Sequence, residues 1–351
     1  MEWIDLRSDT VTHPTDAMRE AMARAEVGDD VYGEDPTVNR LQEIAAEKVG
    51  MQASIFVPSG TMGNLAALLA HCGRGDEIIV GDRAHTYMFE AGGVSALGGV
   101  HTYSVPNNAD GSIDLQNLED AIRADDAHYP HTACIALENT HNLCGGSYQT
   151  AAYTDSVADL AHSRGIRLHI DGARIFNAAA AQDVQVRELT EPADSVTFCL
   201  SKGLCAPVGS MICGTDEYIG RVHRIRKQLG GGMRQAGVLA AAGIIALETM
   251  VDRLAEDHRR ARELASALDD IDGLEVETKE PPTNMVYFRI IDASHRSGEE
   301  FVNMLAKQGV RINPPRGGRI RIVTHYWIDD EALEKTIASM RSVMHDLLVA
   351  G

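Results

Sequence analysis

The sequence Ser201-Lys202-Gly203-Leu204-Cys205-Ala206-Pro207-Val208-Gly209 comes directly after an apolar run from Val196 to Leu200. A second apolar run, from Ile166 to Ile170, is followed at once by Asp171. Short runs of this kind, rich in β-branched residues and bounded by polar residues and glycine, predict buried strands. Each of the two expected strands therefore ends at a charged side chain, a carboxylate in one and an amine in the other.

Strand-like and helical patterns alternate around these two runs. Between residues 50 and 213, short β-branched runs are separated by segments whose apolar residues recur every three to four positions. This alternation predicts an α/β fold with a mainly parallel sheet that helices cover on both faces, and ligands of such sheets bind beyond the carboxyl ends of the strands. The expected strands are Ser54–Val57, Glu77–Val80, Val100–Val105, Thr132–Leu137, Ile166–Ile170, Ser195–Leu200 and Ser210–Cys213, and the expected helices include Thr61–His71, Leu115–Ile122 and Ala152–Ser163.

The alternation stops at Gly230-Gly231-Gly232. Residues 233–269 then predict one long helix or two, and a strand, helix, strand, helix pattern follows at Met285–Ile290, Gly298–Gln308, Arg319–Thr324 and Asp330–Leu348. We therefore expect a large domain of residues 1–250 and a small C-terminal α+β domain of residues 251–351.

Composition restricts the classes of partner. The 351 residues are 44% hydrophobic, enough for a large core, and 51 acidic against 32 basic residues give a formal charge of −19. A surface with this much negative charge repels the phosphate backbone of nucleic acids, so we expect no nucleic-acid partner. No apolar run approaches the ~18 residues of a membrane span, and the N-terminus lacks the pattern of a signal peptide, so we expect a cytoplasmic protein without a membrane partner. The six cysteines form no Cys-x-x-Cys pair, so neither disulfides nor a zinc site are expected.

An amine and a carboxylate at strand ends are the two protein groups that a pyridoxal phosphate enzyme requires. Lys202 would form a Schiff base with the cofactor aldehyde, and Asp171 would pair with the pyridinium nitrogen. Taken alone, Lys202 would more often be a solvated lysine and Asp171 a helix cap. Their joint occurrence, Arg174 three residues after Asp171, and the scarcity of lysine favour the cofactor hypothesis, since Lys202 is one of only six lysines.

A second candidate site is Ser59-Gly60-Thr61-Met62-Gly63-Asn64, which follows a strand-like run and opens a helix. Free backbone N–H groups at a helix start attract anions, Gly60 would let a phosphate approach, and Ser59 and Thr61 add hydroxyl groups. An ordinary helix cap explains the same residues about equally well. The spacing matches neither the dinucleotide nor the nucleoside triphosphate motif, so both ligands are disfavoured.

Two histidines follow expected strands. His85 lies shortly after the strand that ends at Val80, and His141 shortly after the one that ends at Leu137. Either imidazole could stack on a planar ring or relay a proton, although a surface-loop histidine is the simpler explanation of each. A further pair, His128 and His131, lies in an expected loop without other ligands nearby, so we expect no metal site.

Two segments could contact a substrate. Arg319 and Arg321 alternate with apolar residues, so both guanidinium groups should lie on one face of a strand and could bind a carboxylate, or simply face solvent. The turn-rich stretch from Gly28 to Pro36, which contains Tyr32, could form the rim of a metal or substrate site, or be only a loop.

Taken together, these segments resemble the low-specificity L-threonine aldolases, a family of fold type I pyridoxal phosphate enzymes. Each segment is weak evidence by itself, but their common order and spacing are specific and extend through most of the chain. The segments are Arg7–Thr12, Gly28–Val38, Ser59–Asn64, Ala84-His85, Glu90–Gly93, Glu138–Asn142, His169–Asn177, Ser201–Ser210, Met233–Gly237 and Arg321–His325.

The resemblance implies an aspartate aminotransferase-like large domain, pyridoxal 5'-phosphate as the cofactor, and retro-aldol cleavage of L-threonine or L-allo-threonine to glycine and an aldehyde. Lys202 would be the Schiff-base lysine and Asp171 the pyridinium partner, with His85 stacked on the ring and either His85 or His141 acting as the base. The residues implied for cofactor binding also include Ser59, Gly60, Thr61, Arg174, Lys227 and Arg234, and those implied for substrate binding are Ser8, Tyr32, Arg174, Arg316 and Arg321. Lys227 and Arg234 would approach the phosphate from a neighbouring subunit, which implies a catalytic homodimer that pairs into a homotetramer.

Other fold type I enzymes are the nearest alternatives, namely a β-eliminating lyase, a racemase or a desulfurase. A catalytically silent protein that retains the fold as a scaffold is a more distant one, and an α/β hydrolase is disfavoured because no Gly-x-Ser-x-Gly is present. Residues 125–131 depart from the family pattern, which leaves the stereochemical preference at the β-carbon open. The sequence also leaves open the natural substrate, the identity of the base and whether a structural cation is bound. It leaves open, too, whether the acidic excess and the scarcity of lysine reflect salt tolerance.

Overall fold

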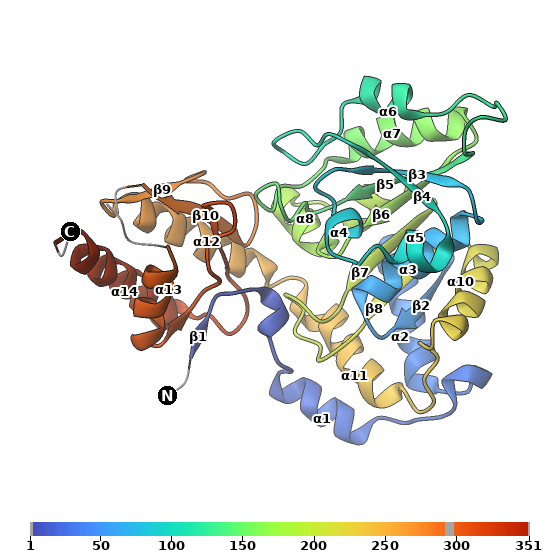
Figure 1. Ribbon diagram of the computed structural model, residues 1–351. Helices are drawn as coiled ribbons and strands as arrows, with labels where there is room; N and C mark the ends of the chain where they lie inside the picture. Colours follow the sequence, from blue (N-terminus) through green and yellow to red (C-terminus); the bar gives the residue numbers. More distant parts are fainter. Residues whose placement is uncertain (1–2, 292–297, 350–351) are drawn as a thin grey trace. The chain divides into compact units, whose positions relative to one another are not determined.

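A computed structural model describes residues 3–291 and 298–349 and divides the chain into two compact units (Figure 1). The larger unit comprises residues 13–251, and the smaller one combines residues 1–12 with residues 252–351. The sequence-based boundary at residue 250 assigns the first twelve residues to the large domain, whereas the structure groups them with the C-terminal residues.

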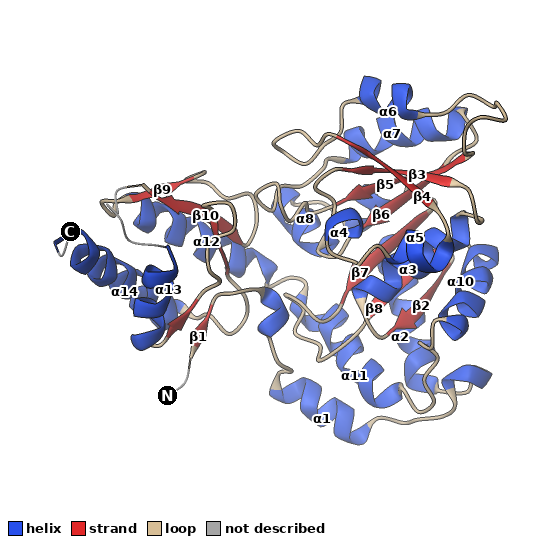
Figure 2. Cartoon of the chain, viewed as in Figure 1, coloured by secondary structure: helices blue, strands red, loops and turns tan. Residues whose placement is uncertain are grey.

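The larger unit is built on a seven-stranded sheet in which only one strand runs against the others (Figure 2). The order is β2-β8-β7-β6-β5-β3-β4; β8 is antiparallel to β2 and β7, and all other neighbours are parallel. The expected mainly parallel sheet is therefore confirmed, and each strand lies within one or two residues of its predicted range. The strands are β2 (Ala53–Val57), β3 (Glu77–Gly81), β4 (His101–Val105), β5 (Thr132–Glu138), β6 (Arg167–Asp171), β7 (Ser195–Cys199) and β8 (Ser210–Gly214).

Helices cover both faces of this sheet because successive side chains of a strand point to opposite sides. In β2, Ile55 and Val57 pack with residues of α3 and α10 in one apolar cluster, whereas the Ser54 hydroxyl donates a hydrogen bond of 2.7 Å to the Gln42 carbonyl of α2. The helices of this unit are α1 (Asp16–Arg24), α2 (Pro36–Val49), α3 (Gly60–His71), α4 (His85–Met88), α5 (Gly93–Gly98), α6 (Leu115–Ala121), α7 (Ala151–Ser163), α8 (Ile175–Gln182), α9 (Val186–Thr190), α10 (Asp216–Gln228) and α11 (Gly237–Ile245).

The smaller unit has an α+β architecture, as the sequence predicts. Its three-stranded antiparallel sheet has the order β12-β10-β9, and β1 pairs in parallel with β11 through Ile4 and Val310. The expected helical stretch 233–269 is divided into α11, a π-helical turn at Ala246–Met250, and α12, which belongs to this unit. The remaining elements are β1 (Ile4–Asp5), α12 (Leu254–Asp269), β9 (Leu274–Val276), β10 (Met285–Ile290), α13 (Gly298–Lys307), β11 (Val310–Arg311), β12 (Ile320–Val323) and α14 (Asp330–Val349).

The apolar core of the smaller unit is separate from that of the larger one and includes Leu6 from the N-terminal segment with Phe288 and Phe301. Among the residues that the structure describes, no helix has both the length and the apolar composition that a membrane span requires.

A buried polar cluster lies between β6, β7 and α3 of the larger unit. His71 Nε2 and His169 Nδ1 lie 2.7 and 2.8 Å from the Ser195 hydroxyl oxygen, and Tyr218 stacks on the His71 ring. Burial lowers the pKa of His71 to about 4 and that of His169 to about 3. Both imidazoles are therefore neutral in the folded protein over the range in which free histidine titrates. His169 has the core role that its position inside an apolar strand suggests.

We expect the free energy of unfolding to fall as pH decreases below about 6.5, because the unfolded chain binds protons that folded His71 and His169 do not. The decrease should be steepest between about pH 6 and pH 4 and amount to at most about 2.7 kcal/mol per pH unit for the two residues together. Guanidinium unfolding at pH 7, 6 and 5 measures it. His71→Gln should reduce the slope, whereas the exposed His345→Gln should not, and equal slopes in the two variants would contradict the assignment.

Candidate functional site

Most candidate residues of the larger unit lie at or after the carboxyl ends of five strands that run in the same direction. The antiparallel β8 does not interrupt this edge, because Ser210 at its start pairs with Val57 at the end of β2 and with Cys199 at the end of β7. One edge of the sheet therefore collects side chains from segments far apart in the sequence. These are Ser59 to Thr61 after β2, His85 after β3, His141 after β5, Asp171 at the end of β6 and Lys202 after β7.

Asp171 is buried and held by two donors. Its Oδ2 accepts a hydrogen bond of 2.8 Å from Asn64 Nδ2, and its Oδ1 accepts one of 3.2 Å from the Ala173 backbone N–H. The Thr197 hydroxyl donates to Asn64 Oδ1 at 2.6 Å, which fixes the amide with its N–H groups toward the carboxylate. Hydrogen bonds of this kind stabilise a negative charge at a fixed place, the function expected of a partner for a cationic ring.

Lys202 lies in a tight loop that joins β7 to β8. The loop is closed by backbone hydrogen bonds from Leu200 to Gly209 and from Cys205 to Lys202, with Cys205 at a positive φ of 65°. Lys202 itself is only partly buried. The charges of Lys202 and Asp171 both act on His85, so each of the two groups lies within electrostatic reach of that ring.

His85 begins α4 and is anchored at two points. Glu138 at the end of β5 accepts a hydrogen bond of 2.6 Å from the His85 backbone N–H, and Glu90 accepts one of 2.9 Å from its ring Nδ1. The bond to Glu90 raises the pKa of His85, and the charge of Asp171 adds to this effect, whereas burial and Lys202 oppose it. The His85 side chain is 36% exposed, so the ring is both oriented and accessible.

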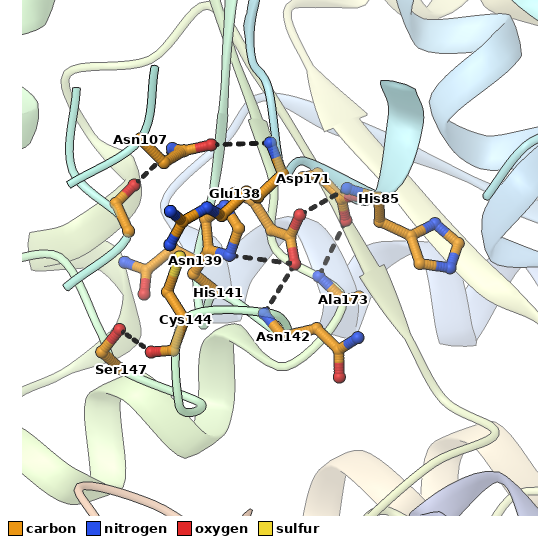
Figure 3. Close-up of polar contacts among 12 residues, drawn as sticks. His85, Asn107, Glu138, Asn139, His141, Asn142, Cys144, Ser147, Asp171 and Ala173 are labelled. Atoms are coloured by element: carbon orange, nitrogen blue, oxygen red, sulfur yellow. Dashed lines mark hydrogen bonds and ion pairs between the residues drawn. The ribbon is translucent and has the colours of Figure 1, made fainter. Parts of the chain in front are cut away.

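His141 is enclosed. It is 1% exposed, and its Nδ1 lies 4.0 Å from Glu138 Oε1 (Figure 3). The backbone at Gly111 packs against its side chain. Neither ring nitrogen has a hydrogen-bond partner among the residues that the structure describes. A substrate could not touch this imidazole in the present conformation, so of the two proposed bases the geometry favours His85.

Four residues without an assigned role in the sequence complete this arrangement. Asn64, Thr197 and Glu90 form a chain of hydrogen bonds with Asp171 and His85, and Glu138 accepts from the backbone N–H groups of His85 and Asn142. The sequence signals for Glu138 are its place as a charged residue at the end of an apolar strand and its membership of the segment Glu138–Asn142, which carries the family resemblance. Glu90 stands in a segment that carries the family resemblance, but its pairing with His85 depends on three-dimensional distances.

The start of α3 has the features of an anion site. Ser59 is the N-cap and its hydroxyl accepts a hydrogen bond from the Met62 N–H, whereas the other N–H groups of the first turn have no acceptor within the helix. Gly60, the first residue of α3, lies beside the end of β7, and a Cβ at this position would be 2.9 Å from Cys199 Sγ. The start of α3 can therefore lie this close to Cys199 only because residue 60 has no side chain.

We expect Gly60→Ala to weaken pyridoxal phosphate binding about tenfold and to lower the free energy of unfolding by about 1–3 kcal/mol, because the new methyl group overlaps Cys199. Cofactor titration and guanidinium unfolding measure the two effects. Adding Cys199→Ala should restore stability but not affinity. Gly220→Ala in α10, where a Cβ would meet nothing within 4 Å, is the matched control. Cofactor binding as tight as in the wild type would exclude Gly60 from the phosphate site.

These residues fit pyridoxal phosphate. The set consists of a partly buried lysine, a buried carboxylate, a histidine on which both charges act, and a helix N-terminus at the same edge of one sheet. Arg174, three residues after Asp171, is a buried cation at the start of α8.

His85, Glu90 and Asp171 also place one potential metal ligand each within 4.8 Å of one another. However, Glu90 Oε1 and Asp171 Oδ2 both accept from the Asn64 amide, and His85 Nδ1 bonds to Glu90. One oxygen of each carboxylate and Nδ1 of His85 are therefore already hydrogen-bonded. The absence of a metal stays a prediction.

Tyr32 and Arg234 lie together on the surface of the larger unit. Tyr32 is 73% exposed, and the Arg234 guanidinium lies 5.9 Å from its ring centroid and 2.9 Å from Asp29 Oδ2. Lys227 is also exposed, near the end of α10. Their exposure is compatible with the expected contacts between subunits, which stay predictions.

The remaining substrate candidates belong to the smaller unit. Arg321 Nη2 donates a hydrogen bond of 3.2 Å to the Arg7 carbonyl, directly before Ser8, so the structure brings these two candidates together. Arg316 is exposed in the turn before β12. Arg319 is hydrogen-bonded to Glu277 and stacks on Tyr287, so its charge is already balanced. Binding of the substrate by Ser8, Arg316 and Arg321 stays a prediction.

Residues 125–131 lie at the opposite edge of the large sheet, since they directly precede the first residue of β5. Arg123, just before them, binds the buried Glu77 and stacks on Tyr103 and Tyr129. Within one chain, this departure from the family pattern is therefore remote from Lys202 and His85.

Comparisons with known proteins agree with this geometry. The model of the family described as "Beta-eliminating lyase" matches residues 5–291. The chain is 46% identical over 347 residues to "Low-specificity L-threonine aldolase 1" of Arabidopsis thaliana, and the match covers 98% of this chain and 97% of the relative. It is also 46% identical over 341 residues to "Low specificity L-threonine aldolase" of Escherichia coli K12, where the match covers 97% of this chain and 99% of the relative. Among solved structures, the threonine aldolase of Leishmania major has a TM-score of 0.82 at 17% identity and covers 97% of this chain and 99% of its own, a likeness that concerns the fold alone.

Proposed function

Since the chain belongs to the beta-eliminating lyase family and, within it, to the low-specificity L-threonine aldolases, we propose that it cleaves L-threonine and L-allo-threonine to glycine and acetaldehyde. It is a pyridoxal phosphate-dependent aldehyde-lyase with the fold type I architecture. The family, fold, cofactor and reaction expected from the sequence are thereby confirmed.

The observation that carries this function is the placement of Lys202, Asp171 and His85 at one sheet edge, with Asp171 fixed by Asn64. In this proposal Lys202 binds the cofactor covalently, Asp171 pairs with its ring nitrogen, and His85 stacks on its ring. Ser59, Gly60 and Thr61 hold its phosphate at the start of α3. When bound, pyridoxal phosphate accepts the electron pair that the breaking Cα–Cβ bond leaves on Cα.

The chain's own side chains supply the remaining steps. Arg174, buried beside the Asp171 loop, binds the substrate carboxylate and thereby orients the Cα–Cβ bond. His85 accepts the proton of the β-hydroxyl, which allows that oxygen to form the aldehyde carbonyl as the bond breaks. The fixed negative charge of Asp171 keeps a proton on the ring nitrogen that it faces.

We also propose a homotetramer made of two catalytic dimers, in which Lys227 and Arg234 reach the phosphate of a neighbouring subunit. Their exposed positions support this arrangement. Size-exclusion chromatography with light scattering tests the assembly, and a monomer with full activity would exclude it. The cytoplasmic location expected from the sequence stays a prediction.

The reaction is tested by incubating the protein with L-threonine and L-allo-threonine, with and without added cofactor. Cleavage between Cα and Cβ releases glycine and acetaldehyde, whereas β-elimination from the same substrates releases 2-oxobutanoate and ammonia. Glycine and acetaldehyde in equal amounts, dependent on the cofactor, are expected. 2-Oxobutanoate as the main product, or pyruvate or sulfide formed faster from other amino acids, would refute the proposal in favour of another fold type I activity.

A further inference from the structure

Glu90 is a buried carboxylate directly beside the proposed base. It lies in the loop between α4 and α5, is 4% exposed, and places Oε1 2.9 Å from His85 Nδ1 and 2.8 Å from Asn64 Nδ2. A carboxylate oxygen that receives two N–H groups acts as a pure acceptor, so the proton between the two side chains belongs on His85 Nδ1. Nε2 is then the nitrogen of His85 that can accept a further proton.

The charges around His85 support this distribution of protons. Asp171 at the end of β6 and Glu90 both favour the protonated ring, Lys202 after β7 disfavours it, and Glu138 from β5 binds only the backbone N–H. Burial and the charge of Asp171 raise the pKa of Glu90, while its bonds to His85 and Asn64 act in the opposite direction. The two hydrogen bonds thus favour the charged form of Glu90 against its burial.

One amide connects this pair to the proposed partner of the cofactor ring. Asn64 uses Nδ2 to donate to both Glu90 and Asp171, and Thr197 holds the amide in that orientation. Rotation of the Asn64 side chain would break both bonds together. The geometry of the base and that of the ring-nitrogen partner are therefore set by the same residue.

We propose that Glu90 is a positioning residue, which keeps Nδ1 of His85 protonated so that Nε2 takes the proton of the β-hydroxyl. This inference rests on the proposed function and adds to it the residue that prepares the base. Glu90 does not touch the reacting atoms and acts through His85.

The first test is the pH dependence of kcat/KM for threonine cleavage by the holoenzyme of Glu90→Gln. Below the pKa of His85 the ring is doubly protonated and cannot act as a base, so that pKa sets the acid limb. Because Glu90 raises the pKa of His85, removing its charge should move the acid limb about one pH unit lower. The plateau should fall about tenfold, since a weaker and less oriented base remains.

The second test does not depend on catalysis. Diethyl pyrocarbonate reacts with neutral imidazole, so its rate of reaction at His85, followed by peptide mass spectrometry across pH on the full-length protein with and without cofactor, reports the protonation of that ring. The profile of Glu90→Gln should move to lower pH by the same amount as the acid limb. Glu90→Asp, which keeps the charge on a shorter arm, should lie between the two proteins and provides a second variant if the glutamine protein is unstable.

The matched control is Glu77→Gln. Glu77 is also a buried glutamate that accepts a hydrogen bond from a histidine Nδ1, that of His101 at 2.8 Å, but it lies at the opposite edge of the sheet. Its loss should cost stability without moving the acid limb.

An acid limb that stays in place in Glu90→Gln, or moves equally in Glu77→Gln, would overturn the role of Glu90. If the acid limb moves in Glu90→Gln but the pH profile of the reaction at His85 does not, the titration belongs to another group, and this result would also overturn the role of Glu90. If the wild type cleaves no β-hydroxy-α-amino acid but the His85 profile still shifts, the proposed function fails while the control of His85 by Glu90 is supported.

Discussion

Lys202→Ala is expected to lower threonine cleavage by at least about 1,000-fold and to remove the visible absorbance of a covalently bound cofactor. The reason is that Lys202 supplies an amine at the sheet edge where Asp171 and His85 also lie. Removing a residue that forms a covalent bond in catalysis eliminates a reaction path and not merely a contact. Steady-state kinetics and an absorbance spectrum of the purified protein measure both effects.

Lys48→Ala is the matched control for this variant. Lys48 lies in the last turn of α2, in the same unit but away from the sheet edge, and its loss should leave activity and colour unchanged. Borohydride reduction of the holoprotein followed by peptide mapping should place the cofactor on Lys202. A Lys202→Ala protein that is coloured and fully active would refute the covalent assignment, and with it the site as we describe it.

Asp171→Asn is expected to lower kcat by about 1,000-fold while the fold is retained. The substitution removes the charge that holds the ring nitrogen protonated and also disturbs its surroundings. The single oxygen of the substituted amide can accept a hydrogen bond from Asn64 or from Ala173, but it cannot replace both carboxylate oxygens. The NH2 group of the amide would then face the N–H donor of the other neighbour. Because Thr197 resists a compensating flip of Asn64, the new amide has no simple way to satisfy its neighbours.

Asp194→Asn provides the comparison. Asp194 precedes β7 at the opposite edge of the same strands, where bonds from Leu168, His162 and Arg167 help to lower its carboxyl pKa. Its neutralisation should reduce stability without a thousandfold loss of kcat. Asp171→Glu, which keeps the charge, should recover part of the activity. A near-normal kcat in Asp171→Asn, with cofactor bound, would move the ring-nitrogen role to another residue.

The sequence predicts the large sheet well because its signals are local. Central strands such as β5 and β7 are buried along their whole length, and their β-branched runs stand out from the helices between them. The very short strands cannot be predicted from such local patterns. β1 and β11 have two residues each and β9 has three, too few for a period to be recognised.

The site is predictable to the extent that its chemistry appears at strand ends. Lys202, Asp171 and His85 each follow an apolar run, and the direction of parallel strands brings them to one edge. The supporting residues have no such signal. Thr197 and Asn64 are separated by 133 positions, and Asn64 and Glu90 by 26, so their roles depend on distances that only the folded chain defines. The burial of His141 is likewise invisible in the sequence.

The pairing of β1 with β11 has a consequence for biosynthesis. Ile4 lies beside Val310, so the smaller unit needs residues that leave the ribosome about 300 positions apart. The larger unit can begin to fold while synthesis continues, whereas β1 must wait for its partner β11. Closing so long a loop costs conformational entropy, and a short strand pair cannot offset that cost by itself. Leu6 is buried in the core of the smaller unit, and this apolar burial helps to hold the segment in place.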